Sequence, residues 1–160
     1  GMSVRVRDAD LSRDKPALLR FLAGSNKFES QWESDRRLDA AFPEEFLAEL
    51  VARANAKQGR LFVAEDAGIV VGWAMCFVDH HETFVRPEDR PFGYVAEMYV
   101  EEAARGRHVG RTLLESCEGH FRALGLKSAL IGALSHNARA VNAYRAAGYA
   151  DYAVNLRKVL

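Results

Sequence analysis

Apolar and polar residues alternate along parts of the chain in the manner of β-strands, and other parts show helical spacing. Strict alternation over residues 4–10 predicts a strand. Two apolar runs, 60–66 and 69–80, are joined by the Ala-Gly pair at 67–68 and therefore predict a β-hairpin. Gly72 in its second arm indicates a bulge or a close backbone approach. Further strands are predicted over 94–101, 127–134 and 149–160, the last as one or two strands.

Four stretches space their apolar residues three and four positions apart, as amphipathic helices do. In the first stretch, Ser12 suits the N-cap and Gly24 suits the end. In the second, Pro43 suits the first turn and Gly59 suits the end. The sequence therefore predicts helices over 11–25, 42–59, 109–125 and 136–148.

The predicted order of elements is β-α-α-β-β-β-α-β-α-β, with room for one more strand at the end. The early hairpin implies antiparallel pairing, and the late strand–helix–strand unit implies a parallel pair. The expected fold class is α/β with a mixed, mostly antiparallel central sheet and helices on both faces. We expect residues 1–160 to form a single domain, and we attribute Gly1, which precedes Met2, to expression cloning.

The composition is that of an ordinary globular protein, with 49% hydrophobic and 28% charged residues. Lys plus Arg and Asp plus Glu both number 22, and the resulting net charge of zero argues against a general nucleic-acid binder. Cys76 and Cys117 have a spacing that suits neither a zinc site nor a disulfide framework. No run approaches the roughly 18 apolar residues of a membrane span. We therefore expect a reduced, cytoplasmic setting without nucleic-acid or membrane partners, and the oligomeric state stays open, a homodimer included.

Three arginines, Arg105, Arg107 and Arg111, surround two glycines where the third predicted helix begins. Arginine is unfavourable at the positive end of a helix by up to about 1 kcal/mol per charge, and no Ser, Thr, Asp or Asn occupies the natural N-cap position. A bound phosphate would accept the free N–H groups and pair with the arginines, and the glycines would let the backbone approach it. The alternative is a solvated loop whose arginines are neutralised by the two glutamates at 101–102.

The segment 99–114, YVEEAARGRHVGRTLL, resembles motif A of the GNAT superfamily of acetyl-CoA-dependent N-acetyltransferases. That motif is Gln/Arg-x-x-Gly-x-Gly/Ala at the start of a helix, five residues after an apolar strand position. Arg105 takes its first place, Gly110 its last and Val100 the strand position. The middle glycine of the motif is replaced by His108.

The segment 137–149, NARAVNAYRAAGY, resembles the second signature of the same family, Asn-x-x-Ala-x-x-x-Tyr-x-x-x-Gly-Phe/Tyr. The predicted order of elements is also that of the family. The resemblance is strong over residues 95–149 and extends by pattern from Val4 to the C-terminus. The positions that match the second signature are Asn137, Ala140, Tyr144, Gly148 and Tyr149.

The resemblance implies a GNAT-like fold, with acetyl-CoA as the cosubstrate, no metal, and direct transfer of acetyl to an amine in a ternary complex. The pyrophosphate of coenzyme A is expected on the N–H groups of the loop and helix start, where His108 either crowds it or donates a hydrogen bond to it. The pantetheine arm is expected along the strand at 98–100, with the thioester where this strand splays from the next parallel strand. The implied cofactor-binding residues are Met98, Tyr99, Val100, Arg105, Gly106, Arg107, His108, Val109, Gly110, Arg111, Asn137 and Tyr144.

Acetyl transfer from a thioester to an amine requires a base for the ammonium, donors for the oxyanion and an acid for the thiolate. Glu97 is the candidate base, because it is the only acid in the apolar segment 94–100. Partial burial would raise its pKa. By resemblance, Tyr144 is the candidate acid, and the backbone N–H of Met98 or Tyr99 would polarise the thioester carbonyl. Two alternatives stay open: strand alternation also allows Glu97 to face solvent, and Tyr144 also fits an apolar stripe with residues 140–141.

The acceptor side is the part of the site that the sequence determines least. Phe28, Trp32 and Glu33 are expected in the acceptor wall, as the corresponding region is in the family, and His80, or the histidine after it, is expected to reach the pocket. The sequence DHHE at 79–82 does not predict a metal site, because adjacent side chains on a strand point to opposite faces. The acceptor amine is expected to belong to a small molecule or a peptide, and polyamines, aminoglycosides, amino acids and protein N-termini all stay open. An acyl-CoA-binding regulatory module without turnover is the alternative function.

Overall fold

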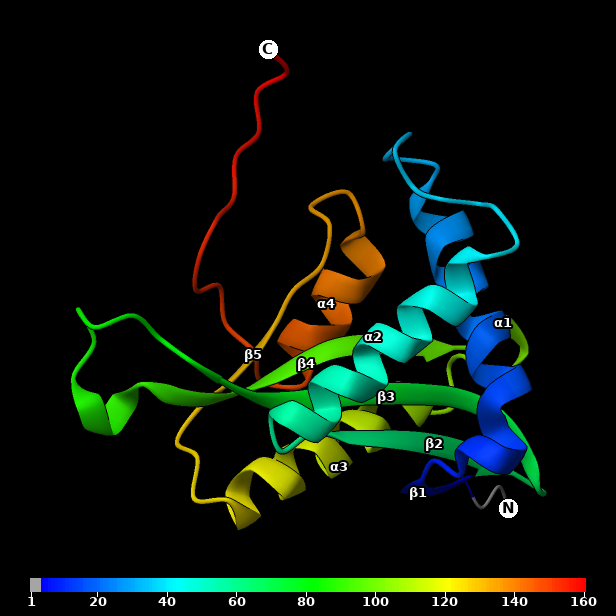
Figure 1. Cartoon of the computed structure of the whole chain (residues 1–160), viewed down its shortest axis with the longest axis horizontal. Helices are drawn as coiled ribbons and strands as arrows, with labels where there is room; N and C mark the ends of the chain where they lie inside the picture. Colours follow the sequence, from blue (N-terminus) through cyan, green and yellow to red (C-terminus); the bar gives the residue numbers. More distant parts are fainter. Residues whose placement is uncertain (1–3) are drawn as a thin grey trace.

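A computed structural model describes residues 4–160, which form a five-stranded sheet and four α-helices (Figure 1). The strands lie in the order β1-β2-β3-β4-β5, and all neighbours are antiparallel except β4 and β5, which are parallel. This confirms the predicted mixed, mostly antiparallel sheet. The strands are β1 (Val4–Asp8), β2 (Arg60–Asp66), β3 (Ile69–His80), β4 (Pro91–Val100) and β5 (Ala129–Ile131).

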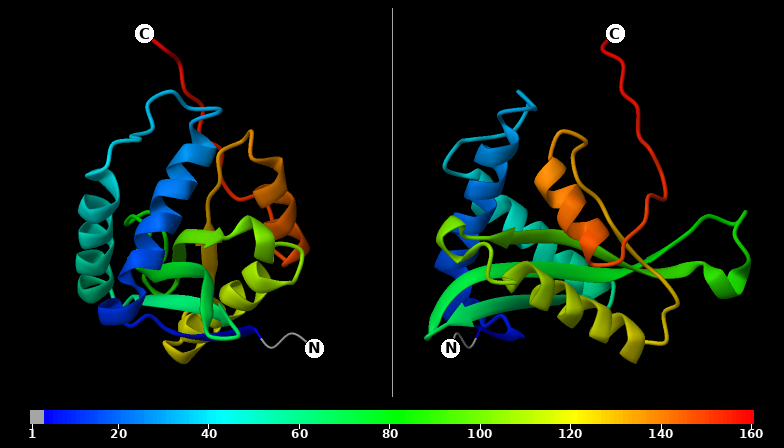
Figure 2. Two further views of the ribbon diagram at one scale, coloured as in Figure 1. Left: turned by 90° about the vertical axis from the view of Figure 1, so that its right-hand side faces the viewer. Right: turned by 180° about the vertical axis from the view of Figure 1, so that it is seen from behind.

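The helices cover both faces of the sheet, as predicted (Figure 2). Those on one face are α1 (Leu11–Glu29) and α2 (Phe42–Ala56), and α3 (Val109–Ala123) lies on the other face. The fourth helix, α4 (Ala138–Ala146), follows β5 and contributes Tyr144 to the core on the α3 side. No helix among residues 4–160 is long and apolar enough to cross a lipid bilayer.

Alternation along β3 builds two separate cores, one on each face of the sheet. Trp73 and Met75 are buried under α1 and α2, whereas Ala74 and Cys76 are buried under α3. All four side chains are at most 1% exposed. Because both faces of this strand are covered, its sequence is a nearly continuous apolar run rather than an alternating one.

The β2–β3 hairpin forms as predicted. Ala67 and Gly68 have φ angles of +51° and +81°, the left-handed pair that a two-residue type I′ turn requires. Gly72 lies opposite Ala64 next to a shift in register, and a Cβ at Gly72 would come within 2.9 Å of the carbonyl oxygen of Tyr99. The bulge and the close backbone approach predicted at Gly72 are therefore both present.

Helix α1 differs from its prediction at both ends. Its N-cap is Asp10 rather than Ser12: the Asp10 carboxylate accepts a hydrogen bond from the Ser12 N–H at 3.0 Å. The helix also continues past Gly24 to Glu29. Gly24 is a contact point rather than an end, because a Cβ there would lie 2.7 Å from the hydroxyl oxygen of Tyr99. Residues 25–29 are consequently held on a helix beside β4.

Residues 149–160 form no strand, and the predicted terminal strands are therefore wrong. The segment extends away from the sheet (Figure 1), and Arg157 donates to both carboxylate oxygens of Glu33 at 3.0 and 2.9 Å. Tyr152, Val154 and Leu156 alternate as strand residues do, but they are 71%, 79% and 93% exposed. The alternation is present, but among residues 4–160 no strand pairs with this segment, and the free edge of β5 is not used.

Candidate functional site

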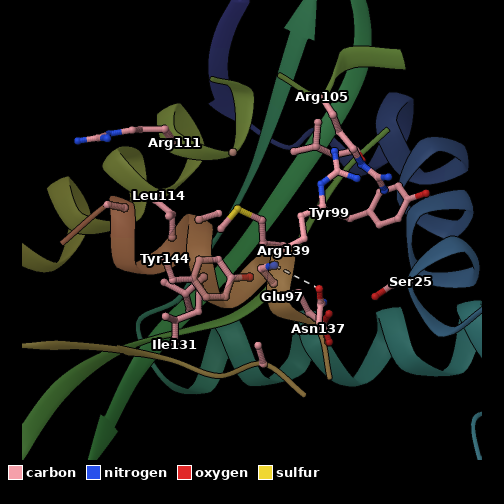
Figure 3. A pocket seen from close by; sticks show the side chains of 18 of the residues that line it. Ser25, Glu97, Tyr99, Arg105, Arg111, Leu114, Ile131, Asn137, Arg139 and Tyr144 are labelled. Carbon is pink, nitrogen blue, oxygen red and sulfur yellow. Dashed lines mark hydrogen bonds between the residues drawn. The ribbon is translucent and has the colours of Figure 1, made fainter. Parts of the chain in front are cut away.

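A cavity of about 500 Å³ opens where β4 and β5 separate (Figure 3). The two strands pair only from Gly93 opposite Ala129 to Val95 opposite Ile131. Beyond these pairs β4 continues to Val100, while the chain after β5 leaves the sheet and leads into α4. The predicted splay is therefore present, and the gap has the size of a small-molecule site.

A β-bulge in β4 turns Glu97 toward α1 and α2. Met75 lies opposite Glu97 while the next residue, Cys76, lies opposite Val95, so Ala96 is an extra residue in β4. Met75 belongs to the core under α1 and α2, and Cys76 belongs to the core under α3. Since directly opposite residues share a face, Glu97 lies on the α1–α2 side, whereas regular alternation from Val95 would place it under α3.

Glu97 is half-buried and lines the cavity. Burial, and then the negative charge of Glu29 on α1, raise the pKa of Glu97 to about 7, against a smaller lowering by Arg53 on α2. A carboxyl group with this pKa is poised to take up and release a proton near neutral pH, which is the property that a general base needs.

Tyr144 on α4 lines the same cavity, and Figure 3 shows its phenol ring beside Glu97. Burial, followed by the charges of Glu97 and Glu29, raises the pKa of Tyr144 to about 12, so the phenol keeps its proton at neutral pH. Its ring also packs against the α3-side core, so a core position and a cavity position coexist. Asn137 caps α4 by accepting the Ala140 N–H at 3.2 Å through Oδ1, which leaves Nδ2 as its side-chain donor.

Helix α3 begins beside the cavity without a side-chain cap. Its N-cap is His108, whose φ of +61° is left-handed and whose exposed side chain makes no capping hydrogen bond. The first intrahelical bond runs from the Thr112 N–H to the His108 carbonyl oxygen at 3.0 Å, so the N–H groups of residues 109–111 precede the helical hydrogen-bond ladder. The left-handed backbone explains why glycine suits position 108. His108 adopts this conformation although it is not a glycine.

The three arginines of this segment take different directions. Arg105 lines the cavity and donates from Nε to the carbonyl oxygen of Val100 at 3.0 Å. Arg111 also lines the cavity and is 53% exposed. Arg107 instead lies outside the cavity lining, forms an ion pair with Asp66 at the end of β2, and has a buried Nε without an acceptor among residues 4–160. Arg107 is thus placed to hold the loop rather than to contact a ligand.

The structure brings the other predicted cofactor-binding residues together around one cavity, from β4, the β4–α3 loop, the start of α3, and α4. These residues are Met98, Tyr99, Val100, Arg105, Gly106, His108, Val109, Gly110, Arg111, Asn137 and Tyr144.

The α1 side of the cavity differs from the predicted acceptor wall. Ser25, Phe28 and Glu29 line the cavity, and Phe28 is 38% exposed. Trp32 lies behind this wall, with its ring centroid 5.0 Å from that of Phe28 in an edge-to-face contact. Glu33 is held by the C-terminal segment instead. Glu29 was missed because helix α1 was expected to end at its glycine, and the helical spacing of four from Ser25 would have identified it.

The two histidines at the end of β3 do not reach the cavity. His80 lies opposite Pro91 and is five positions along β3 from Met75, the partner of Glu97, which corresponds to roughly 16 Å along the strand. His81 stacks on a phenylalanine of β4 with 4.3 Å between ring centroids. Within residues 4–160, no three His, Cys, Asp or Glu side chains are grouped to hold a metal ion.

The sequence and the fold were compared with those of known proteins. The model of the Acetyltransferase (GNAT) family matches residues 26–149. The IAA acetyltransferase of Azospirillum brasilense is 34% identical over 120 residues, which cover 74% of this chain and 73% of that protein. The family-model match includes both segments that carry most of the cavity lining, 95–114 and 131–147.

Solved structures share the fold at low sequence identity. A tetramutant of the BH1408 protein from Bacillus halodurans superposes with a TM-score of 0.82 at 16% identity, covering 98% of this chain and 99% of that one. An aminoglycoside N-acetyltransferase solved in complex with CoA superposes with a TM-score of 0.68 at 16% identity, covering 99% and 96%. The family model matches most of this chain, and one relative is more than 30% identical to it. The chain therefore belongs to the Acetyltransferase (GNAT) family.

Proposed function

We propose that this protein, acting as a single domain, transfers an acetyl group from acetyl-CoA to a primary amine of a small molecule or peptide. The observation that carries the proposal is the convergence of free helix N–H groups, a splayed strand edge, Glu97 and Tyr144 on one cavity. Family membership supports acetyl transfer, and the aminoglycoside N-acetyltransferase of the same fold holds CoA.

The residues around the cavity suit coenzyme A. The N–H groups of residues 109–111, with Arg105 and Arg111, form a cluster for the pyrophosphate at the start of α3. The edge of β4 at 98–100 has no neighbouring strand on the β5 side and can pair with the amides of the pantetheine arm. The Nδ2 of Asn137 adds a donor beside that edge.

In this proposal Glu97 removes a proton from the ammonium of the acceptor, directly or through water. The free amine then attacks the carbonyl carbon of the thioester, a C–N bond forms, and the N–H of Met98 or Tyr99 stabilises the oxyanion. The C–S bond breaks and Tyr144 donates its phenolic proton to the leaving sulfur. The second amine proton restores Tyr144, and Glu97 releases its proton to solvent, so that the products are an acetamide, CoA and one proton.

The two catalytic groups are coupled in a favourable sense. The charge of Glu97 is one of the causes that raise the pKa of Tyr144. When Glu97 takes the proton of the acceptor it becomes neutral, and this contribution disappears. Tyr144 therefore becomes a stronger acid at the stage of the reaction when the thiolate needs its proton.

The proposal is tested by CoA calorimetry together with thiol release from acetyl-CoA across a panel of primary amines. We expect CoA to bind with one-to-one stoichiometry and thiol release to depend on the added amine, with the acetylated amine identified by mass spectrometry. Binding of CoA without any amine-dependent thiol release would overturn the proposal in favour of a regulatory acyl-CoA-binding module.

A further inference from the structure

The charged side chains of the cavity are unevenly distributed. Arg105 and Arg111 come from the loop and helix start on the α3 side, and Arg139 comes from the start of α4. The acids that line the cavity are Glu97 and, on α1, Glu29. In Figure 3 Arg111 lies far from the α1 wall that carries Ser25, whereas Arg105 lies beside the ring of Tyr99, close to that wall. Among the α1 residues that line the cavity, Ser25, Phe28 and Glu29, the charged one is Glu29, so the α1 wall contributes negative charge.

Glu29 is held in place by a network that remains negatively charged. The Nε of Arg36 donates to Oε1 of Glu29 at 2.9 Å, and Nη1 of the same arginine donates to Asp35 at 2.6 Å. One guanidinium thus serves two carboxylates, and the three side chains together carry a net charge of −1. No residue among 4–160 donates a hydrogen bond to Oε2 of Glu29, which leaves this oxygen available to a ligand.

The surroundings of Glu29 suit a cation. Its charge reaches across the cavity, since it contributes to the raised pKa values of both Glu97 and Tyr144. Phe28, the preceding residue, adds a partly exposed aromatic face that can also attract a cation. Arg53 on α2 is the one basic group that influences Glu97 from this side, and it does not line the cavity. A positively charged ligand group would therefore be favoured beside Glu29.

We propose that the acceptor is a di- or polycationic amine whose second positive charge is bound by Glu29 while the reacting amine lies at Glu97. Glu29 is then a specificity-determining residue, and the reaction itself still depends on Glu97 and Tyr144. This inference rests on the proposed acetyl transfer and adds the class of its acceptor. At the same position an apolar group would leave Oε2 without a donor, a neutral donor would make a weaker hydrogen bond than an ammonium, and an anionic group would face like-charge repulsion.

The test compares 1,4-diaminobutane with 4-amino-1-butanol, which have the same chain length and reacting amine but differ in the charge of the far group. We expect kcat/KM of the wild-type protein to favour the diamine by about tenfold, the range of a partly buried charge-assisted hydrogen bond. Glu29→Gln should reduce this preference to within about twofold. The matched control is Glu45→Gln, which also removes a carboxylate paired with an arginine, 2.6 Å from Arg37, but outside the cavity lining; it should keep the preference.

Equal kcat/KM for the two probes in the wild-type protein, or a preference that survives Glu29→Gln, would overturn the inference and leave acetyl transfer standing. If neither probe is acetylated, calorimetric titration of both into the CoA-saturated protein decides the matter. Tighter binding of the diamine that is lost in Glu29→Gln supports the cation subsite even where the proposed reaction fails, and equal binding of the two probes overturns it.

Discussion

The two ends of the cavity are built from different parts of the chain. At the α3 end the binding groups are mainly backbone N–H groups, fixed by the start of a helix and by a loop that Arg107 ties to Asp66. At the α1 end they are side chains of one helix, with Glu29 held by Arg36. The first end therefore depends on backbone conformation and the second on side-chain identity, so single substitutions should affect cofactor binding and acceptor choice separately.

Gly110→Asp is expected to have the largest effect, at the α3 end. A Cβ at Gly110 would make only ordinary contacts, 3.8 Å from Met98 Sδ and 3.9 Å from Val100 Cγ2, so the fold should tolerate it. The added carboxylate would compete with a phosphate at the helix start, and we expect CoA affinity to fall by roughly 100-fold or more in calorimetry. Gly110→Ala is the control and should stay within about tenfold of wild type. Undiminished binding by the Asp variant would contradict an anion site at this helix.

Tyr144→Phe tests proton transfer separately from CoA binding, at the point where the two ends of the cavity meet. Loss of the phenolic proton should lower kcat by roughly 100-fold, the lower range for a general acid, while the apolar ring is kept. We expect the CoA dissociation constant from calorimetry to change by less than about twofold. A parallel loss of CoA affinity would assign Tyr144 to cofactor binding instead of proton transfer.

Glu97→Gln should stabilise the protein at alkaline pH. The pKa of Glu97 is raised from 4.5 to about 7, so between these values the folded state binds more protons than the unfolded state, and the free energy of unfolding falls as the pH rises. A shift of this size corresponds to roughly 3 kcal/mol. Urea denaturation at pH 4 and pH 8 should show this loss in the wild-type protein but not in Glu97→Gln. The same pH dependence in both proteins would mean that Glu97 is not desolvated.

Arg107→Met tests whether the cofactor end depends on a residue outside the cavity. Without the ion pair to Asp66 the loop should lose its fixed position, and CoA affinity should fall by about tenfold, which is 1.4 kcal/mol. Asp66→Asn should cause a similar loss, and the double variant should be no worse than either single variant, since all three remove one interaction. Fully additive losses in calorimetry would show that Arg107 contacts the cofactor independently of Asp66.

The smallest expected effect is that of His108→Gly. Glycine adopts the observed φ of +61° without the cost of a Cβ, so the variant should gain about 1 kcal/mol in free energy of unfolding, partly offset by greater entropy of the unfolded chain. CoA affinity should stay within about twofold, because the path of the loop is unchanged. Lower stability of the glycine variant would indicate that the imidazole itself supports the loop.

The cofactor end could be predicted from the sequence, because its signals are local. The signals are arginines and glycines around a helix start without a side-chain cap, and an apolar strand before it. All of them lie within residues 95–111, and each constrains the backbone of its own segment. Even there, the direction of Arg107 was missed, since its partner Asp66 lies 41 residues earlier in the chain.

The acceptor end could not be predicted to the same extent, because its determinants are tertiary. Gly24 has the sequence signature of a helix end, but it lies inside α1, where the missing side chain leaves room for the hydroxyl of Tyr99, a residue distant in the sequence. The extra residue Ala96 that turns Glu97 toward α1 is a property of strand pairing and leaves no mark in the sequence of β4 alone.

The account depends most on Glu97 acting as the base between the two ends, and the pH dependence of kcat tests this directly. Initial rates of CoA release from acetyl-CoA with saturating 1,4-diaminobutane would be measured between about pH 5.5 and 9 for the wild-type protein and Glu97→Gln. The account predicts a wild-type kcat that rises with pH as Glu97 loses its proton, and a variant that lacks this rise and is slower by roughly 100-fold at pH 8. Matching rates and pH profiles for the two proteins would contradict it.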